Sequence, residues 1–260
     1  IDRLGQLFSW AQLEDYELAD RLTERMSTDH NRRDRDARDR FEEADLKLLF
    51  STPEYLGEKA FARSAFYWAP LIALYSGARI EEICQLQIND LGLEDGVHYF
   101  DINDNDGKKL KPGQATKRLV PMHSKLVELG LPDYANTLRK AGHSLLFPTL
   151  NPHELNGMSH AVTRWFSTYK QKLGFGPKQV FHSFRHTVAD ESLQTDMNEM
   201  ATNAIVGHTG NSTMSVRRYG KALRLQQLAP KIESLQFQIP AKPYTQCQFS
   251  KAEVNALRNN

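Results

Sequence analysis

The 260 residues carry a formal net charge of +1, and 40% of them are hydrophobic, enough for a sizeable buried core. The two cysteines, Cys84 and Cys247, lie far apart without metal-ligand spacing, which argues against a disulfide framework and a zinc site. The longest uncharged apolar run, residues 64–78, is too short to span a bilayer and contains Pro70. We therefore expect a cytoplasmic chain with no membrane partner.

The charges are unevenly distributed along the chain. Residues 1–60 hold 10 Lys/Arg and 15 Asp/Glu, whereas residues 108–186 hold 13 Lys/Arg and 3 Asp/Glu, a local net charge of +10. A basic block of this kind, interleaved with His and aromatic residues, suits a phosphate-backbone partner. The alternative is a basic face that is merely solvated.

The first 40 residues predict a helical segment followed by a linker. An apolar stripe at helical spacing in residues 1–30 predicts one or two amphipathic helices, too little for a domain. Because the chain begins at Ile1 rather than Met, we interpret residues 1–26 as the last helix of a mostly missing domain. Residues 27–40 are dense in both charges and predict a linker.

A second domain is predicted over residues 41–236, followed by a polar tail over residues 237–260. A helix over about 58–76 is apolar on nearly every side and should be central, with Gly77 as its stop. A further helix is expected to restart over residues 78–91. Other helices are predicted at about 44–51, 123–129, 133–141, 157–173, 182–194, 197–206 and 223–236.

The hydrophobic period changes to that of strands over residues 97–122. Residues 97–102 alternate in polarity, residues 117–123 read as their partner, and the Gly-, Asn- and Lys-rich stretch between them predicts a hairpin tip. We therefore expect a hairpin or a small three-stranded sheet. The predicted fold class is mainly α with a small antiparallel β-sheet.

Two segments offer cations that a phosphate site could use. Arg79 stands at a helix start, which is unusual because cations favour helix C-termini. A surface arginine paired with Glu82 three residues on is the alternative. In the hairpin, Lys111 could reach into a site and donate a proton, and Lys108, Lys109 and Lys117 compete with it. Solvated surface is the alternative for each lysine.

The sequence HSFRH places His182 and Arg185 three residues apart, on one helix face. Arg185 can fork onto two phosphate oxygens, and His182 can carry a proton near neutral pH. A histidine satisfied in a helical core is the alternative. His186 lies four residues after His182, so the two histidines could bind a metal ion together. The segment, however, lacks the Glu of a zinc-protease motif.

The last candidates are a Gly-His pair at residues 207–208 and Tyr219, which follows two arginines. His208 could instead serve in a turn. A tyrosine of pKa near 10 is a poor nucleophile unless cations stabilise its phenolate, which the Arg, His and Lys candidates would do. Packing at a helix end is the alternative for Tyr219.

This ordered set resembles the tyrosine recombinases, also called phage-type integrases. The family pattern is an Arg in a G-x-R-x-x-E helix start, a hairpin Lys, His-x-x-Arg, Gly-His and a nucleophilic Tyr. The sequence supplies GARIEE, LKPGQATKRLVP, HSFR, GH and RRYGK in that order, over about residues 41–222. The resemblance implies the tyrosine-recombinase catalytic fold, with residues 1–26 as the end of a core-binding domain.

The resemblance also implies a reaction. Tyr219 would attack a scissile DNA phosphate and form a 3′-phosphotyrosine with a free 5′-hydroxyl. Arg79 and Arg185 would clamp the non-bridging oxygens, and His208 would add a hydrogen bond there. Lys111 would protonate the leaving 5′-oxygen.

Two further roles follow from the same resemblance. His182 would help take the tyrosine proton, and Glu82 would orient the site without reacting. Neither a cofactor nor a metal is required. The expected partner is double-stranded DNA, with a homotetramer on DNA at full length and possible accessory DNA-bending proteins, in a nucleoid-associated bacterial or phage setting.

Three alternatives stay open at this point. One is a DNA-binding protein with a degenerate site, and another is type IB topoisomerase-like strand cleavage. The third is a metal-dependent nuclease that uses His182 and His186.

Overall fold

The computed structural model describes residues 39–110, 117–154, 157–195, 197–207 and 224–244. The chain divides into two units, Ile1–Asp39 and Arg40–Asn260, and the elements below belong to the second. The expected helix over residues 1–26 and the expected linker up to residue 38 lie outside the described residues. The proposed domain boundaries therefore stay predictions.

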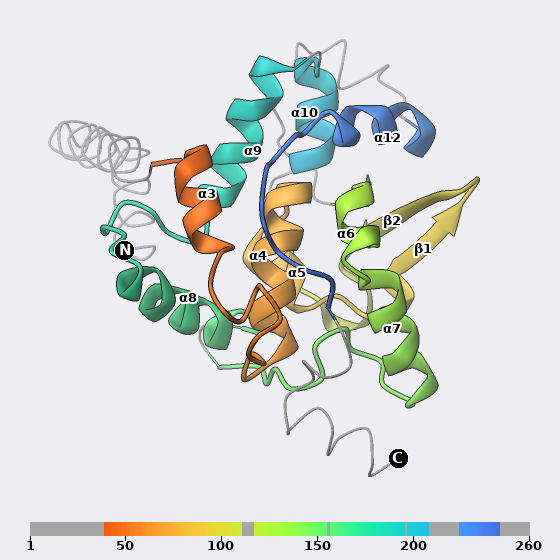
Figure 1. Ribbon diagram of the computed structural model, residues 1–260. Coiled ribbons are helices and arrows are strands. Elements are labelled where there is room, and N and C mark those ends of the chain that lie inside the picture. Colours follow the sequence, from red (N-terminus) through yellow and green to blue (C-terminus); the bar gives the residue numbers. More distant parts are fainter. Residues whose placement is uncertain (1–38, 111–116, 155–156, 196, 208–223, 245–260) are drawn as a thin grey trace, which may run out of the picture. The chain divides into compact units, whose positions relative to one another are not determined.

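The described residues form a mainly helical domain with one small sheet (Figure 1). The longer helices are α3 (Glu43–Leu49), α4 (Ser64–Ser76), α7 (Leu131–Lys140), α8 (His160–Lys172), α9 (Ser183–Gln194), α10 (Glu199–Val206) and α12 (Leu225–Glu233). The short ones are α5 (Ile80–Cys84), α6 (Ser124–Glu128) and the 3-10 turns η1 (Ile88–Asp90) and η2 (Asn105–Gly107). The strands are β1 (Leu91–Glu94), β2 (Val97–Ile102) and β3 (Arg118–Pro121).

The helix α4 is the centre of the domain, because every one of its residues is buried. It packs against α5, α6, α8 and α9, which surround it in Figure 1. Pro70 inside α4 has no N–H to donate to the carbonyl of Phe66. The buried hydroxyl of Tyr55 donates to that carbonyl at 3.1 Å instead, so the interruption leaves no unsatisfied group there.

The sheet is antiparallel in the order β1-β2-β3, so the predicted fold class is confirmed. In β3 the alternation of sides places Val120 in the core while Leu119 is exposed. Figure 1 shows the sheet beside α6 and α7, and β3 also packs against α10 and α12. The sheet thus connects to the helices that follow it in the chain.

Two predicted helices are shorter than expected. The helix expected from about residue 58 begins at Ser64, because Arg63 is extended and Phe61 packs against Trp165 instead of continuing a helix. The helix expected over residues 78–91 ends at Cys84. Beyond it, Gln87 bridges Leu145, so contacts distant in sequence override the helical pattern.

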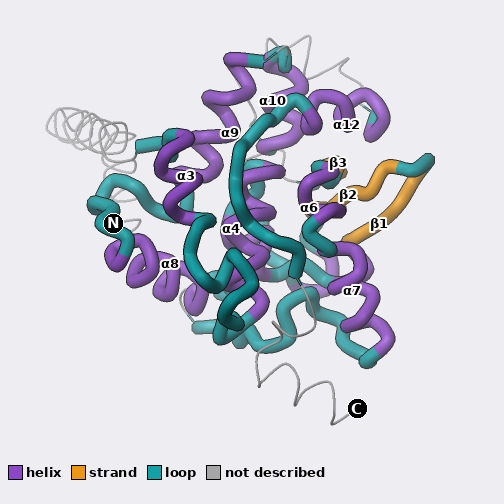
Figure 2. The backbone as a smooth tube through the Cα atoms, in the orientation of Figure 1, coloured by secondary structure: helices purple, strands orange, loops and turns teal. Residues whose placement is uncertain are grey.

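The described part of the expected tail, residues 237–244, returns across α4 (Figure 2). Its backbone is fixed at two points, where Lys242 N donates to Tyr55 O at 2.9 Å and Tyr244 N donates to Leu129 O at 2.8 Å. Ile239, Ala241 and Tyr244 are buried. No helix within the described residues is long and apolar enough to cross a membrane.

The aromatic cluster around Phe184 of α9 generates a stability prediction. Phe184 is fully buried, with its ring centroid 4.7 Å from that of Phe41 and 5.5 Å from that of Phe166. We expect Phe184→Ala to lower the free energy of unfolding by about 3–5 kcal/mol, because it removes buried area and leaves a cavity. Urea unfolding measures this change.

The matched control lies on the same helix. Leu193 is 76% exposed, so Leu193→Ala should change the free energy of unfolding by no more than about 0.5 kcal/mol. Equal losses in the two variants would contradict the packing described for α9.

Candidate active site

Arg79 stands immediately before α5, where the chain leaves α4. Gly77 ends α4 with a φ of +63°, and a Cβ there would lie 2.8 Å from Val206, so the turn requires glycine. Glu82 accepts hydrogen bonds from Arg79 N at 2.9 Å and from Arg79 Nη1 at 2.8 Å. The carboxylate therefore compensates a cation at an unfavourable helix terminus.

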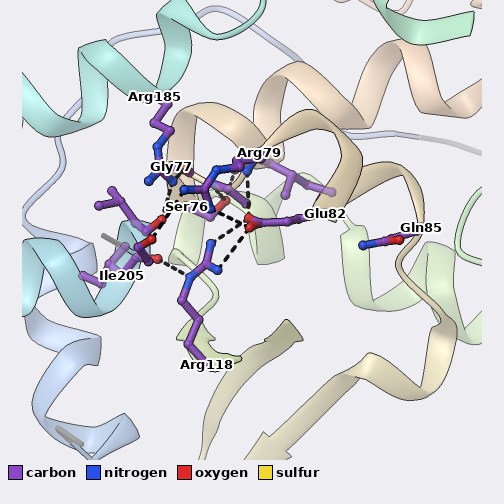
Figure 3. Close-up of polar contacts among 12 residues, drawn as sticks. Ser76, Gly77, Arg79, Glu82, Gln85, Arg118, Arg185 and Ile205 are labelled. Atoms are coloured by element: carbon purple, nitrogen blue, oxygen red, sulfur yellow. Dashed lines mark hydrogen bonds and ion pairs between the residues drawn. The ribbon is translucent and has the colours of Figure 1, made fainter. Parts of the chain in front are cut away.

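Arg118 of β3 is a site residue that the sequence analysis did not select. Its Nη2 donates to Glu82 Oε2 at 2.8 Å, and its Nε donates to Ile205 O at 2.8 Å (Figure 3). The signal that could have found it is the strand period, since Arg118 shares a face with Val120, which is buried. A cation on an inward face needs a partner, and Glu82 is that partner.

Arg185 enters the same site from the first turn of α9. Its Nη1 donates to Gly77 O at 2.7 Å and also to Val206 O. Only 3% of Arg185 is exposed, yet its Nη2 has no hydrogen-bond partner among the described residues. Burial, together with the charges of Arg79 and Arg118, lowers the pKa of Arg185 to about 9.

The carboxyl end of α10 joins the three arginines. The carbonyls of Ile205, Val206 and Gly207 accept from Arg118, Arg185 and, at 3.5 Å, Arg79 respectively. Such terminal carbonyls lack partners within their helix and carry partial negative charge, so guanidinium groups suit them.

Gly207 is required where α10 ends. Its φ is +69°, and a Cβ would come within 2.8 Å of Arg118 Nη1. The glycine of the Gly-His pair thus makes room for an arginine of the site.

Within the described part of the chain, three guanidinium groups gather around the carboxylate of Glu82, which is hydrogen-bonded to Arg79 and Arg118. Burial alone would raise the pKa of Glu82, but hydrogen bonds and charge from Arg118 and Arg79 outweigh it and hold that pKa below its usual value. The carboxylate therefore stays ionised. Guanidinium groups arranged in this way suit a tetrahedral oxyanion such as a phosphate.

His182 immediately precedes α9, one turn before Arg185, and is partly exposed. Its ring centroid lies 5.0 Å from that of His186. Within the described ranges, no group of three or more His, Cys, Asp or Glu residues could hold a metal ion.

The hairpin lysines differ in their surroundings. The Lys108 ammonium is 2.6 Å from Asp90 in a buried ion pair, and Lys117 pairs with Asp104 at an exposed site. Lys109 is exposed. Lys108 is thus committed to Asp90, whereas the exposed Lys109 stays a candidate to reach a substrate.

Three predicted site residues, Lys111, His208 and Tyr219, lie outside the described residues. The structure brings Arg79, Glu82 and Arg185 together and adds Arg118. The functional roles of all the predicted site residues stay predictions.

The basic block at residues 108–186 is less exposed than its charge indicates. Lys108, Arg118, Lys170 and Arg185 all have buried side chains. Lys170, for example, donates to Gly176 O. Among the cations of the block that the structure describes, these four therefore serve the interior rather than a partner surface.

Comparison with known proteins points to one family. The model of the phage integrase family matches residues 39–224. A tyrosine recombinase of Pseudothermotoga lettingae is 28% identical over 169 residues, which are 65% of this chain and 54% of that protein. The tyrosine recombinase XerC of Chlamydia trachomatis is 30% identical over 145 residues, or 54% of this chain and 42% of that protein. The chain thus spans about half the length of these relatives.

A solved structure shares the fold. The integrase from mycobacterium phage Brujita superposes with a TM-score of 0.50 at 18% sequence identity, covering 80% of this chain and 60% of that chain. At this identity the likeness concerns the fold alone. It confirms the predicted catalytic fold.

The ionised Glu82 generates a pH prediction. Glu82→Gln removes the negative charge that pairs with Arg79 and Arg118, so we expect it to lower the free energy of unfolding by about 3–5 kcal/mol at pH 7. Because the folded pKa of Glu82 is depressed, its contribution is complete above the unfolded pKa of about 4.3 and is lost as pH falls through the folded value. Urea unfolding from pH 7 to 3.5 should show the two proteins converging below about pH 4. A constant difference would contradict this account.

The unpartnered donor of Arg185 generates a second prediction. Sulfate at ten times its Kd should stabilise the wild type by about 1.4 kcal/mol beyond its general salting effect. Arg185→Lys removes the guanidinium group, which can donate to two oxygens of one anion, so this variant should lose the stabilisation by sulfate. Lys172→Gln changes an exposed position on α8 and should keep that stabilisation. Thermal unfolding in sulfate and in chloride of equal ionic strength measures it. An equal increment in all three proteins would contradict an oxyanion site.

Proposed function

The chain belongs to the phage integrase family, and on that premise we propose that it cuts and rejoins DNA strands in site-specific recombination through a 3′-phosphotyrosine intermediate. The observation that carries the proposal is the convergence of Arg79, Arg118 and Arg185 on Glu82 and the end of α10. This cluster is a preformed oxyanion site, built before any substrate arrives.

The arginine cluster would act on the scissile phosphate. A phosphodiester carries one negative charge, and attack on phosphorus builds up a second on the non-bridging oxygens. Arg79 and Arg185 would bind those oxygens, and the unpartnered Nη2 of Arg185 is a donor ready for one of them. Donors already fixed by Glu82 and α10 need no reorganisation as charge develops.

The chemical step needs groups from beyond the described residues. The Tyr219 oxygen would bond to phosphorus as the bond from phosphorus to the 5′-oxygen breaks, with His182 taking the phenolic proton and Lys111 protonating the leaving oxygen. His208 would add a hydrogen bond to the phosphate. The covalent link conserves the phosphodiester energy for rejoining, so the reaction needs neither metal nor nucleotide.

The partners and the domain organisation belong to the same proposal. Double-stranded DNA would bind the exposed cations of residues 108–186, and full-length protein would form a homotetramer on DNA, with accessory DNA-bending proteins possible. Residues 1–26 would end a core-binding domain, 27–40 would link it, 41–236 would form the catalytic domain, and 237–260 the C-terminal segment. The proposed setting is the cytoplasm of a bacterium, at the nucleoid.

Covalent trapping in cells tests the proposal. Wild-type protein isolated under denaturing conditions should carry DNA, and sequencing that DNA gives the target. Tyr219→Phe should abolish the adduct, because it removes the nucleophilic oxygen. Tyr99→Phe, in β2, removes a hydroxyl elsewhere and should leave the adduct unchanged.

A duplex carrying the trapped sequence then separates the alternatives in vitro. We expect cleavage and strand exchange that persist in excess chelator. Adducts on Tyr219→Phe, or cleavage abolished by chelator, would overturn the proposal. Relaxation of supercoiled DNA without strand exchange would indicate a topoisomerase, and binding without cleavage a degenerate site.

A further inference from the structure

Gln85, the residue that follows α5, holds the connection between β2 and β3. Gln85 Oε1 accepts from Lys109 N at 2.8 Å, and Gln85 Nε2 donates to Lys109 O at 2.9 Å. One buried side chain thus satisfies both backbone groups of one residue, as a neighbouring strand would. The contact spans 24 positions of sequence and joins two otherwise separate segments.

The residue before Lys109 is held as well. Lys108 Nζ lies 2.6 and 2.7 Å from the two oxygens of Asp90, which also accept from Asn103 Nδ2 at 2.9 Å and Gln87 N at 2.7 Å. Both side chains of the ion pair are almost fully buried. Lys108 and Lys109, which we call the root of the connection between β2 and β3, are therefore both fixed. Lys108 is held through its side chain and Lys109 through its backbone.

The short helix α5 links this root to the arginine cluster. Arg79 immediately precedes α5, Glu82 lies in its first turn, and Gln85 follows its last residue. The six steps from Arg79 to Gln85 span about 9 Å of helix, so one short continuous segment connects the arginine cluster to the contact with Lys109. Figure 3 shows Gln85 on the opposite side of Glu82 from Arg185. Both polar atoms of the Gln85 amide are engaged by the backbone of Lys109.

We propose that Gln85 is a positioning residue for leaving-group protonation, because it fixes the root of the lysine-bearing connection relative to the arginine cluster. The inference rests on the proposed function. A lysine two residues beyond Lys109 is separated from the root by at most about 7 Å of backbone, so the position of the root limits where its ammonium can reach. A proton donor that is held in place acts at a high effective concentration, and one on a loose segment does not.

The chemistry offers a readout that a general structural defect would not move. With the natural substrate, the bond from phosphorus to the 5′-oxygen breaks and that oxygen takes a proton from the lysine ammonium. With sulfur in place of the 5′-oxygen, the leaving thiolate needs no proton, because a thiol has a pKa of about 8.5. A defect confined to proton donation should therefore disappear on the sulfur substrate.

Gln85→Met is the principal variant, since it conserves volume while removing both hydrogen bonds to Lys109. Gln85→Glu is the second, because it keeps an acceptor for Lys109 N and loses the donor to Lys109 O. Gln226→Met is the matched control, at an exposed glutamine on α12. Thermal unfolding establishes that each variant is folded, and Lys111→Ala and Lys109→Ala identify the donor.

Single-turnover cleavage by the full chain is measured on the trapped target sequence, with oxygen or sulfur at the 5′ position. We expect Gln85→Met to be slowed at least about tenfold on oxygen and to be within about twofold of wild type on sulfur, with Gln85→Glu intermediate. Whichever of Lys111→Ala and Lys109→Ala removes the proton donor should show the same pattern. Combining that change with Gln85→Met should slow cleavage of the oxygen substrate little further, since both changes impair the same proton transfer.

Two results would overturn the inference while leaving the proposed function intact. One is a wild-type rate for Gln85→Met on oxygen, and the other is an equal loss on both substrates, which would indicate a structural role alone. If Gln85→Met does not fold, the same comparison is made with Gln85→Glu. Absence of any covalent adduct with wild type on either substrate would instead contradict the proposed function.

Discussion

The ion pairs of Glu82 with Arg79 and Arg118 are the interaction on which the site depends. The two arginines come from a helix start and a strand 39 positions apart in sequence, and neither could be buried without a counter-charge. With Glu82 in place, the carbonyl end of α10 can accept from both of them and from Arg185. One carboxylate therefore assembles four segments around one point.

This assembly places more guanidinium groups than carboxylates at one point in the described part of the chain, an arrangement that suits an anionic substrate. Among the described residues, three guanidinium groups lie around Glu82, and the pKa of Arg185 falls to about 9 because its charge is buried beside the like charges of Arg79 and Arg118. An arriving phosphate would supply the missing negative charge. In the proposed reaction, donors that are already in position would need no reorganisation when charge develops on the phosphate.

Much of the architecture followed from the sequence. The apolar run of α4 with Gly77 at its end, the alternating β2 and β3, and the ordered motifs around Arg79, His182 and Arg185 were sufficient to predict the fold class and the family. The extent of the helix after Gly77 was wrong, because Gln87 pairs with Leu145 and the chain leaves the helix at Gln85. Arg118 was missed because a single arginine in a short strand resembles any solvated cation until its partner is known.

The sequence by itself determined which chemical groups the protein possesses and their order along the chain, since periodicity and motif spacing are local properties. Only the tertiary structure decided which cations are internal. Lys108 is paired with Asp90 and Arg118 with Glu82, while Lys109 is held by its backbone and not by its side chain. Burial and pairing depend on contacts between residues far apart in sequence, and those contacts gather Arg79, Arg118 and Arg185 from separate segments into one cluster.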